Sequence, residues 1–196
     1  MTSKPLRLLG IDPGIHGAIS LLEYHEGHTT ILACDPLPIS ETLQGKDQLN
    51  IPAFASYLQS NPSIALCALE QQGPRSTDGA ASIFTTGRFF GRLETCLALA
   101  SIPTTCPIPQ TWKKVVFAGS GITLQGKERA EQKAAAIAFV KSRFPNLSLR
   151  RTRLARTDDD NMAESVCLAL YALQYLHMSL RQQPSSPQEP TSHVSD

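Results

Sequence analysis

The chain has 196 residues, of which 41% are hydrophobic and 18% are charged, and its formal net charge is +1 at pH 7. This composition excludes a chain that is disordered throughout, and the length suits one domain of ordinary size. No apolar run approaches the roughly 20 residues that cross a bilayer, so we expect no membrane segment.

The charge is distributed unevenly along the chain. Residues 1–74 carry three basic and seven acidic side chains, whereas residues 113–156 carry eleven basic and two acidic ones. The acids Asp158, Asp159, Asp160 and Glu164 follow directly. A basic flank beside an acidic cluster indicates either a polyanion held next to a metal site or a solvated charged surface, and charge alone leaves both open.

The chain contains five cysteines, and none of them forms a Cys-x-x-Cys pair. This usage argues against a zinc site or a disulfide framework and favours a reducing compartment. We expect all five to be small, buried apolar side chains.

The N-terminal part of the chain begins with strand patterns. Short apolar runs predict strands over Leu6–Asp12, Ala18–Tyr24 and Thr29–Cys34. Pro36–Asn50 is expected to be a loop, and apolar residues spaced by three and four predict a helix over Ile51–Leu58.

The central part continues the alternation of strand and helix. A continuous apolar run predicts a buried strand over Ile64–Leu69, followed by a loop over Gln71–Ala81. Helical spacing predicts a helix over Ser82–Ala100, and the Thr- and Pro-rich stretch Ile102–Ile108 is typical of an edge strand. Pro109–Phe117 is expected to form a short helix.

The last part is helical. Lys127–Phe144 has an amphipathic pattern, and a basic connector over Asn146–Thr157 leads to a long apolar helix over Asp159–Leu180. The order of the elements predicts one α/β domain over residues 1–180, with helices on both faces of a mixed five-stranded sheet. Residues 181–196 are rich in Gln, Ser and Pro, which predicts a disordered tail.

Two acidic residues stand at the ends of predicted buried strands. Asp12 closes the first strand before Pro13 and Gly14, so its carboxylate is expected at the edge where α/β sheets keep their sites. Glu70 closes the strand Ile64–Leu69 in the same way. Each acid taken alone also fits an ordinary turn residue or a solvated strand end.

Two further acids begin the last helix. Asp160 and Glu164 are four residues apart, which places both on one helical face. Acids at a helix N-terminus also stabilise the helix dipole, and Asp158 or Asp159 could serve only as a cap. Glu164 enters an otherwise apolar segment, however, where a carboxylate needs a partner.

These four carboxylates can meet in one crevice. Crowded acids raise one another's pKa unless cations neutralise them, and all-oxygen ligands suit Mg²⁺ or Mn²⁺ better than zinc. Two such ions would suit the hydrolysis of a phosphodiester.

Five segments together carry a family resemblance. They are Gly10–Ala18, Ala68–Glu70, Pro109–Lys114, Gly126–Glu128 and Asp159–Ser165. In this order they resemble RuvC-type Holliday-junction resolvases of the RNase H-like superfamily, in its phage- and plastid-like branch. The first and last segments are the most specific.

The resemblance implies an RNase H-like fold and a metal-dependent endonuclease that resolves four-way DNA junctions. It implies a homodimer, because two opposed nicks need two sites related by a two-fold axis; a helix after Glu70, such as Ser82–Ala100, is expected to form the interface. We expect a cytoplasmic, nucleoid-associated protein, with an organelle as the open alternative. A related nuclease acting on RNA or other branched DNA, and a junction-binding protein without catalysis, share these motifs.

The resemblance also implies two Mg²⁺ ions per site, with Mn²⁺ as a substitute. The implied catalytic metal ligands are Asp12, Glu70, Asp160 and Glu164. The bacterial branch spaces its last two acids three apart, and Asn161 stands at that position before Glu164. We therefore favour Asp160, with Asp159 as the alternative.

Basic side chains near these motifs are candidates to bind DNA phosphates. The candidates are Arg75, Arg88, Lys113, Lys114 and Lys127. Lys127 could instead balance charge beside the acids. Of Phe84, Phe89 and Phe90 we expect at least two in the core, which leaves at most one to stack at a branch point. His16 is expected to be exposed.

Overall fold

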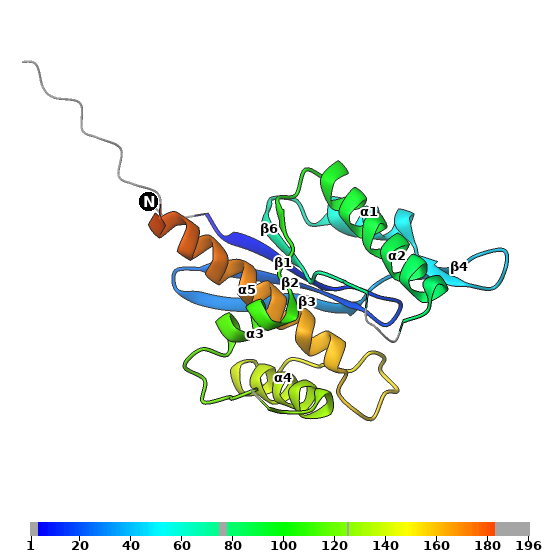
Figure 1. Cartoon of the computed structure of the whole chain (residues 1–196). Helices are drawn as coiled ribbons and strands as arrows, with labels where there is room; N and C mark the ends of the chain where they lie inside the picture. The colour runs from blue at the N-terminus through cyan, green and yellow to red at the C-terminus, as the bar shows by residue number, and fades with distance from the viewer. Residues whose placement is uncertain (1–3, 75–77, 125, 183–196) are drawn as a thin grey trace, which may run out of the picture.

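The computed structural model describes residues 4–74, 78–124 and 126–182. Five strands form one mixed sheet in the order β3-β2-β1-β6-β7 (Figure 1). The strands are Leu6–Asp12 (β1), Ala18–His25 (β2), His28–Pro36 (β3), Ile64–Leu69 (β6) and Thr104–Thr105 (β7). Strand β1 runs antiparallel to β2 and parallel to β6.

Helices cover both faces of this sheet. On one face, α1 (Ile51–Ser60) and α2 (Ala80–Leu99) enclose a core with the sheet. On the other face, α5 (Asp160–Gln182) lies directly on β1 and β2, and α3 (Pro109–Val116) and α4 (Arg129–Arg143) pack against α5. The predicted α/β class, with a mixed five-stranded sheet flanked by helices, is confirmed. None of the described helices is both long and apolar enough to span a membrane.

Some predicted elements differ from the structure. The expected loop Pro36–Asn50 contains a hairpin of Ile39–Glu41 (β4) and Asp47–Leu49 (β5). The predicted strand Ile102–Ile108 shrinks to β7, because two prolines within it lack the amide hydrogen that a sheet ladder needs. Helix α5 continues two residues past its expected end, and the domain boundary at residue 180 stays a prediction, since residues 183–196 lie outside the described part.

All five cysteines are free, as expected. Cys67, Cys96 and Cys167 are buried, and Cys34 is partly buried. The prediction is wrong for Cys106, which lies exposed in the proline-rich segment that follows the edge strand.

Alternation along the central strand decides which side chains meet α5. Leu8 belongs to the core beside α5, whereas Leu9 and Ile11 belong to the core beside α1 and α2. Because successive side chains of a strand point to opposite faces, Gly10 and Asp12 share the α5 face with Leu8. The strand therefore aims its terminal carboxylate toward the helix that carries Asp160 and Glu164.

A row of small residues lets α5 approach the sheet closely. The strand pairing places Gly10 beside Ser20 of β2 and Ala68 of β6. A Cβ atom on Gly10 would lie 2.1 Å from the carbonyl oxygen of Ser165 and 2.2 Å from the amide nitrogen of Ala169. The Ser20 and Ser165 hydroxyls form a buried hydrogen bond of 2.7 Å across the same contact.

We expect Gly10→Ala to lower the free energy of unfolding by roughly 1–3 kcal/mol or more, because the new methyl group meets the α5 backbone rather than a movable side chain. Urea denaturation followed by circular dichroism measures the effect. Gly87→Ala adds the same methyl group where nothing lies within 4 Å, and as a helical substitution it should be neutral or slightly stabilising. Equal stability of Gly10→Ala and the wild type would refute the close contact.

Candidate active site

Two carboxylates meet at one edge of the sheet because β1 and β6 are parallel neighbours. Asp12 is the last residue of β1, and Glu70 directly follows β6. The Glu70 amide donates a 3.0 Å hydrogen bond to the Ile11 carbonyl, which extends the ladder as far as the two acids. Asp12 is only 6% exposed and Glu70 only 8%, so both carboxylates are largely removed from water.

The turn after Asp12 keeps the chain close to this edge. Gly14 has a φ of +135°, a conformation that favours glycine, and the Gly17 amide donates to the Gly14 carbonyl at 2.9 Å. His16 is exposed in this turn, as predicted.

The start of α5 supplies the other two acids and distinguishes Asp159 from Asp160. Asp159 caps the helix: its Oδ1 accepts a 3.1 Å hydrogen bond from the Met162 amide, and its Oδ2 lies 3.6 Å from the Arg151 guanidinium. Asp160 is the first helical residue, and Glu164, one turn later, is 8% exposed. Because the Asp159 oxygens serve the cap and Arg151, this geometry favours Asp160 over Asp159 as the companion of Glu164.

The four carboxylates interact electrostatically. Burial, followed by the charges of Glu70, Glu164 and Asp160, raises the pKa of Asp12 well above its ordinary value of 3.8. Burial also raises the pKa of Glu70, although hydrogen bonds from Trp112 and Asp12 and the charge of Lys113 oppose the rise. The site thus concentrates negative charge in a poorly hydrated place.

Three residues that the sequence analysis did not assign to the acids hold them in position. The Trp112 indole Nε1 donates a 2.9 Å hydrogen bond to Glu70 Oε1. The Lys113 Nζ lies 3.0 Å from Glu164 Oε1, and the Lys133 ammonium pairs with Asp160. The sequence predicts that Lys113 binds phosphate and offers Lys127 as a charge partner of the acids. In the structure, Lys133 lies beside Asp160 instead.

A sequence signal for Lys133 exists in retrospect. It stands three and seven residues before Ala136 and Val140, the buried residues of α4, and therefore on the inner face of that helix. A lysine on such a face indicates a buried acidic partner. Trp112 gives no comparable signal, since a buried tryptophan is most often part of the core.

Oxygen atoms of this kind fit hard divalent cations such as Mg²⁺ and Mn²⁺. Within the described residues, however, no three Asp, Glu, His or Cys side chains are spaced to hold one ion in this conformation. Glu164 and Asp160 instead point to lysine ammonium groups. A metal ion would therefore have to displace these two ion pairs, while the backbone positions of the acids could remain.

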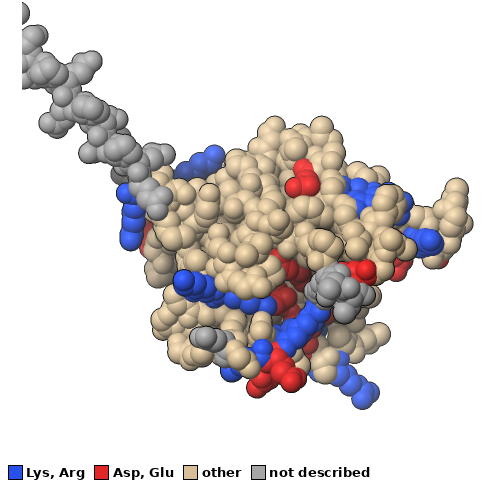
Figure 2. Space-filling view, in the orientation of Figure 1, with Lys and Arg blue, Asp and Glu red and all other residues tan. Residues whose placement is uncertain are grey.

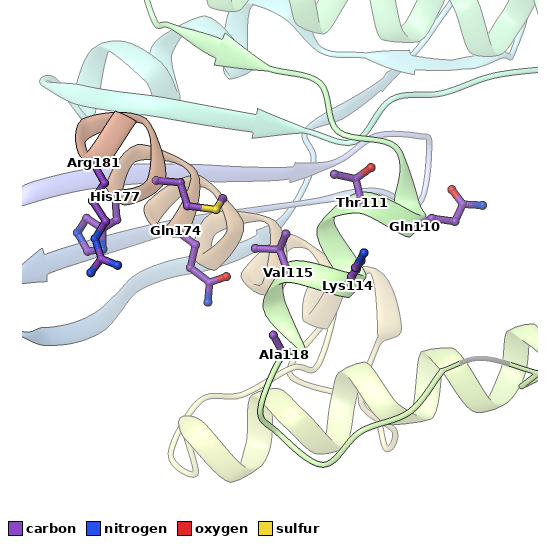
Figure 3. A pocket seen from close by; sticks show the side chains of 9 residues that line it. Gln110, Thr111, Lys114, Val115, Ala118, Gln174, His177 and Arg181 are labelled. Atoms are coloured by element: carbon purple, nitrogen blue, oxygen red, sulfur yellow. The ribbon is translucent and has the colours of Figure 1, made fainter. Parts of the chain in front are cut away.

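The other predicted DNA-binding residues are Arg75, Arg88, Lys114 and Lys127. Arg75 lies outside the described residues. Arg88 is exposed on α2 with its guanidinium 5.8 Å from the Phe84 ring, and Lys114 and Lys127 are exposed. Lys114 lines a hollow of about 880 Å³ between α3 and the C-terminal half of α5, shown in Figure 3, which none of the four acids lines. That these cations bind nucleic acid stays a prediction.

The three phenylalanines divide as expected. Phe89 is buried, Phe90 packs partly buried against the core beside α2, and Phe84 is 69% exposed. In the space-filling view, Asp and Glu residues lie at the bottom of a hollow in the surface, with Lys and Arg residues beside it (Figure 2).

Solved structures of other proteins share this architecture. Thermus thermophilus RuvC in complex with a Holliday junction substrate aligns with a TM-score of 0.54 and 14% identity, over 88% of this chain and 96% of that one. A second Thermus thermophilus RuvC structure aligns with a TM-score of 0.51 and 15% identity, over 90% and 97% of the two chains. The chain has the RuvC fold. The resemblance seen in the sequence is thus confirmed for the fold, while the phage- and plastid-like branch stays a prediction.

Comparison by sequence finds no match. No family model matches the chain, and no curated protein matches it. Identity of 14–15% to the RuvC structures shows a shared fold and leaves the activity to be argued from the site.

The crowding at Asp12 gives a testable pH dependence in metal-free buffer. Because its raised pKa makes the folded chain hold the proton more tightly than the unfolded chain does, stability decreases as pH rises from 3.8 through the raised pKa. Asp12→Asn removes this loss, so we expect it to be more stable than the wild type at pH 7. The gain in the free energy of unfolding is about 1.4 kcal/mol for each tenfold decrease in the acid dissociation constant of Asp12 on folding.

Urea denaturation between pH 5 and pH 8 in EDTA measures this difference. Asp47→Asn, at an exposed position in β5, serves as the control and should leave both the stability and its pH profile unchanged. A less stable Asp12→Asn variant at pH 7 would contradict the crowding of the four acids.

Proposed function

We propose that this chain is a divalent-metal-dependent endonuclease that resolves four-way DNA junctions by paired phosphodiester hydrolysis. The observation that carries the proposal is the convergence of Asp12, Glu70, Asp160 and Glu164 at one edge of a RuvC-type sheet. Three nearly buried carboxylates in one place cost free energy of folding, and in the described part of the chain only Glu164 among them forms an ion pair. A structural role does not account for the other two.

The proposed substrate follows from charge and from the structural neighbour. The eleven basic side chains of residues 113–156 precede Asp160 and Glu164 in the sequence, and Lys113 and Lys133 contact these two acids. This charge suits a polyanion held with its scissile phosphate at the carboxylates. The neighbour with a TM-score of 0.54 is a RuvC in complex with a Holliday junction substrate. A branched DNA is therefore the substrate that we propose.

The four acids would hold Mg²⁺ or Mn²⁺, with two ions per site. Bound there, divalent ions stabilise the charge that develops on the attacking and leaving oxygens of a phosphodiester. Trp112 fixes the orientation of Glu70 through its indole hydrogen bond. Lys113 and Lys133 neutralise Glu164 and Asp160 in the metal-free chain, and both ammonium groups would have to leave these carboxylates for a metal ion to be held there.

In the proposed assembly, two copies of this chain form a homodimer through α2. The first half of this helix is exposed on all sides and carries Ile83, 40% exposed, and Phe84, 69% exposed. Large exposed apolar side chains on one helix are typical of an interaction surface. Two-fold symmetry would then present two sites to the two strands that must be nicked.

Asp160→Asn should slow Mg²⁺-dependent nicking of an immobile four-way junction by roughly 10²–10⁴-fold while leaving junction binding intact, because an amide is a poorer ligand than a carboxylate. Denaturing gels measure nicking, and mobility shifts in EDTA measure binding. Asp159→Asn is the matched control, since asparagine caps a helix as well as aspartate does and nicking should stay near the wild-type rate.

The same assay separates the alternatives. Cleavage of an RNA–DNA hybrid in preference to the junction would identify a nuclease with a different substrate, and binding without nicking would identify a junction-binding protein. A melting temperature that Mg²⁺ raises in the wild type but not in Asp12→Asn supports the metal site independently of activity. Normal nicking by Asp160→Asn would remove that residue from the chemistry.

Phe84→Glu should convert the dimer to a monomer by raising the dissociation constant at least about 30-fold, because a buried charge would replace an apolar anchor. Sedimentation velocity at several concentrations measures this. Leu180→Glu makes the same kind of change at another exposed apolar position, the C-terminal end of α5, and should leave the dimer unchanged. A wild-type chain that sediments as a monomer would refute the proposed assembly.

A further inference from the structure

The connector between α4 and α5 contains a strongly basic loop, residues 150–158, which we call the arginine loop. It carries Arg150, Arg151, Arg153 and Arg156 with one leucine, Leu154, between the last two. Its only acid is Asp158 at its end. Neither the acidic centre nor the proposed dimer surface uses this loop.

The base of the arginine loop is firmly held. The Asp159 amide donates a 2.7 Å hydrogen bond to the carbonyl of the fully buried Leu149, which closes the loop at its neck. Arg151 donates to the His16 carbonyl at 2.7 Å and to the Gly17 carbonyl at 3.3 Å. These contacts fix the loop to the turn that follows Asp12.

A second contact fixes the end of the loop to α4. The Lys141 Nζ lies 2.6 Å from Asp158 Oδ2. The loop is therefore attached to three parts of the molecule: the turn after β1, helix α4 and the cap of α5. In Figure 1 it lies at the end of the sheet where β1 and β2 are joined, next to the start of α5.

The tip of the arginine loop, by contrast, faces solvent. Leu154 is 92% exposed, in a turn closed by a 3.1 Å hydrogen bond from the Ala155 amide to the Thr152 carbonyl. Arg153 and Arg156 are exposed, and no carboxylate in the described part of the chain pairs with either. A rigid base thus presents two free guanidinium groups and an apolar side chain to whatever approaches the acids.

This combination of groups suits a nucleic acid whose base stacking is interrupted. A guanidinium group binds phosphate through two parallel hydrogen bonds. Apolar side chains that proteins insert into DNA pack against unstacked base faces, and the cost of unstacking is lowest where stacking is already broken. A four-way junction offers such faces at its crossover, whereas a continuous duplex does not.

We propose that the arginine loop binds the crossover of a DNA junction, with Arg153 and Arg156 on backbone phosphates and Leu154 against an exposed base face. The proposal deepens the proposed function, on which it rests, by naming the part of the chain that reads the branch. Arg151 is the positioning residue that keeps the loop at a constant place relative to Asp12.

The test uses the full-length protein and an immobile four-way junction with 2-aminopurine at the crossover, in EDTA. Wild-type binding should raise the 2-aminopurine fluorescence as a base is unstacked, and Leu154→Ala should lose this rise. The same variant should lower the preference for the junction over a linear duplex roughly fivefold or more. Leu180→Ala, an exposed leucine at the far end of α5, should behave as the wild type does.

The phosphate contacts are tested by salt dependence. The double variant Arg153→Gln with Arg156→Gln should reduce the log–log slope of junction binding against salt by about 1.8, or roughly 0.9 for each contact. Lys4→Gln, which removes an exposed charge just before the start of β1, should leave the slope unchanged. Circular dichroism checks folding, which these exposed tip positions should not disturb.

An unchanged fluorescence rise in Leu154→Ala would overturn the base contact, and an unchanged salt slope would overturn the phosphate contacts. Equal losses on duplex and junction would place the loop on a DNA arm and overturn its role at the crossover. If the wild type nicks junctions and the variants behave normally, only the loop proposal fails. If the wild type binds as expected but never nicks, only the nuclease proposal fails, and a wild type that binds no junction refutes both.

Discussion

The close packing of α5 on the central strands is the constraint on which the rest of this structure depends. Gly10, Ser20 and Ala68 form a row of small residues across three strands, and the backbone of α5 rests on that row. A larger side chain at Gly10 would lift the helix away from β1. The small size of these three residues therefore sets the distance between the acids at the strand ends and the acids on α5.

A second consequence of this packing is electrostatic. Helix α5 is buried on nearly every side from Met162 to Leu173, so Glu164 enters the protein interior together with apolar neighbours. Its only compensation in the described structure is the ammonium group of Lys113, while Asp12 remains crowded by the other acids. The folded chain thus carries an unfavourable concentration of charge that a purely structural core would avoid, and unfavourable local energetics of this kind are typical of functional sites.

Much of the site could be predicted because it follows local rules. The apolar run Ile64–Leu69 ends at Glu70, and period-two alternation together with parallel pairing brings Glu70 beside Asp12. The spacing of Asp160 and Glu164 placed both on one helical face. What remained open locally was the choice between Asp159 and Asp160, and the structure favours Asp160 because Asp159 caps the helix.

The partners of the acids could not be predicted in the same way. Lys133 reaches Asp160 only because α4 packs on α5, and Arg151 reaches the His16 carbonyl across 135 positions of the chain. Such contacts depend on tertiary packing, which neither periodicity nor local spacing encodes. The same reason explains the missed hairpin of β4 and β5, whose three-residue strands are too short to show a pattern.

The place of α5 in chain order has a consequence for synthesis. Translation delivers β1 to β7 and both helices of the opposite face before the helix that carries Asp160 and Glu164 has left the ribosome. Until then the nascent chain holds only Asp12 and Glu70 and leaves one apolar face of the sheet bare, a surface that chaperones bind. The nascent chain therefore has only two of the four site acids, and none of its proposed nuclease activity, until α5 has emerged and packed against Gly10.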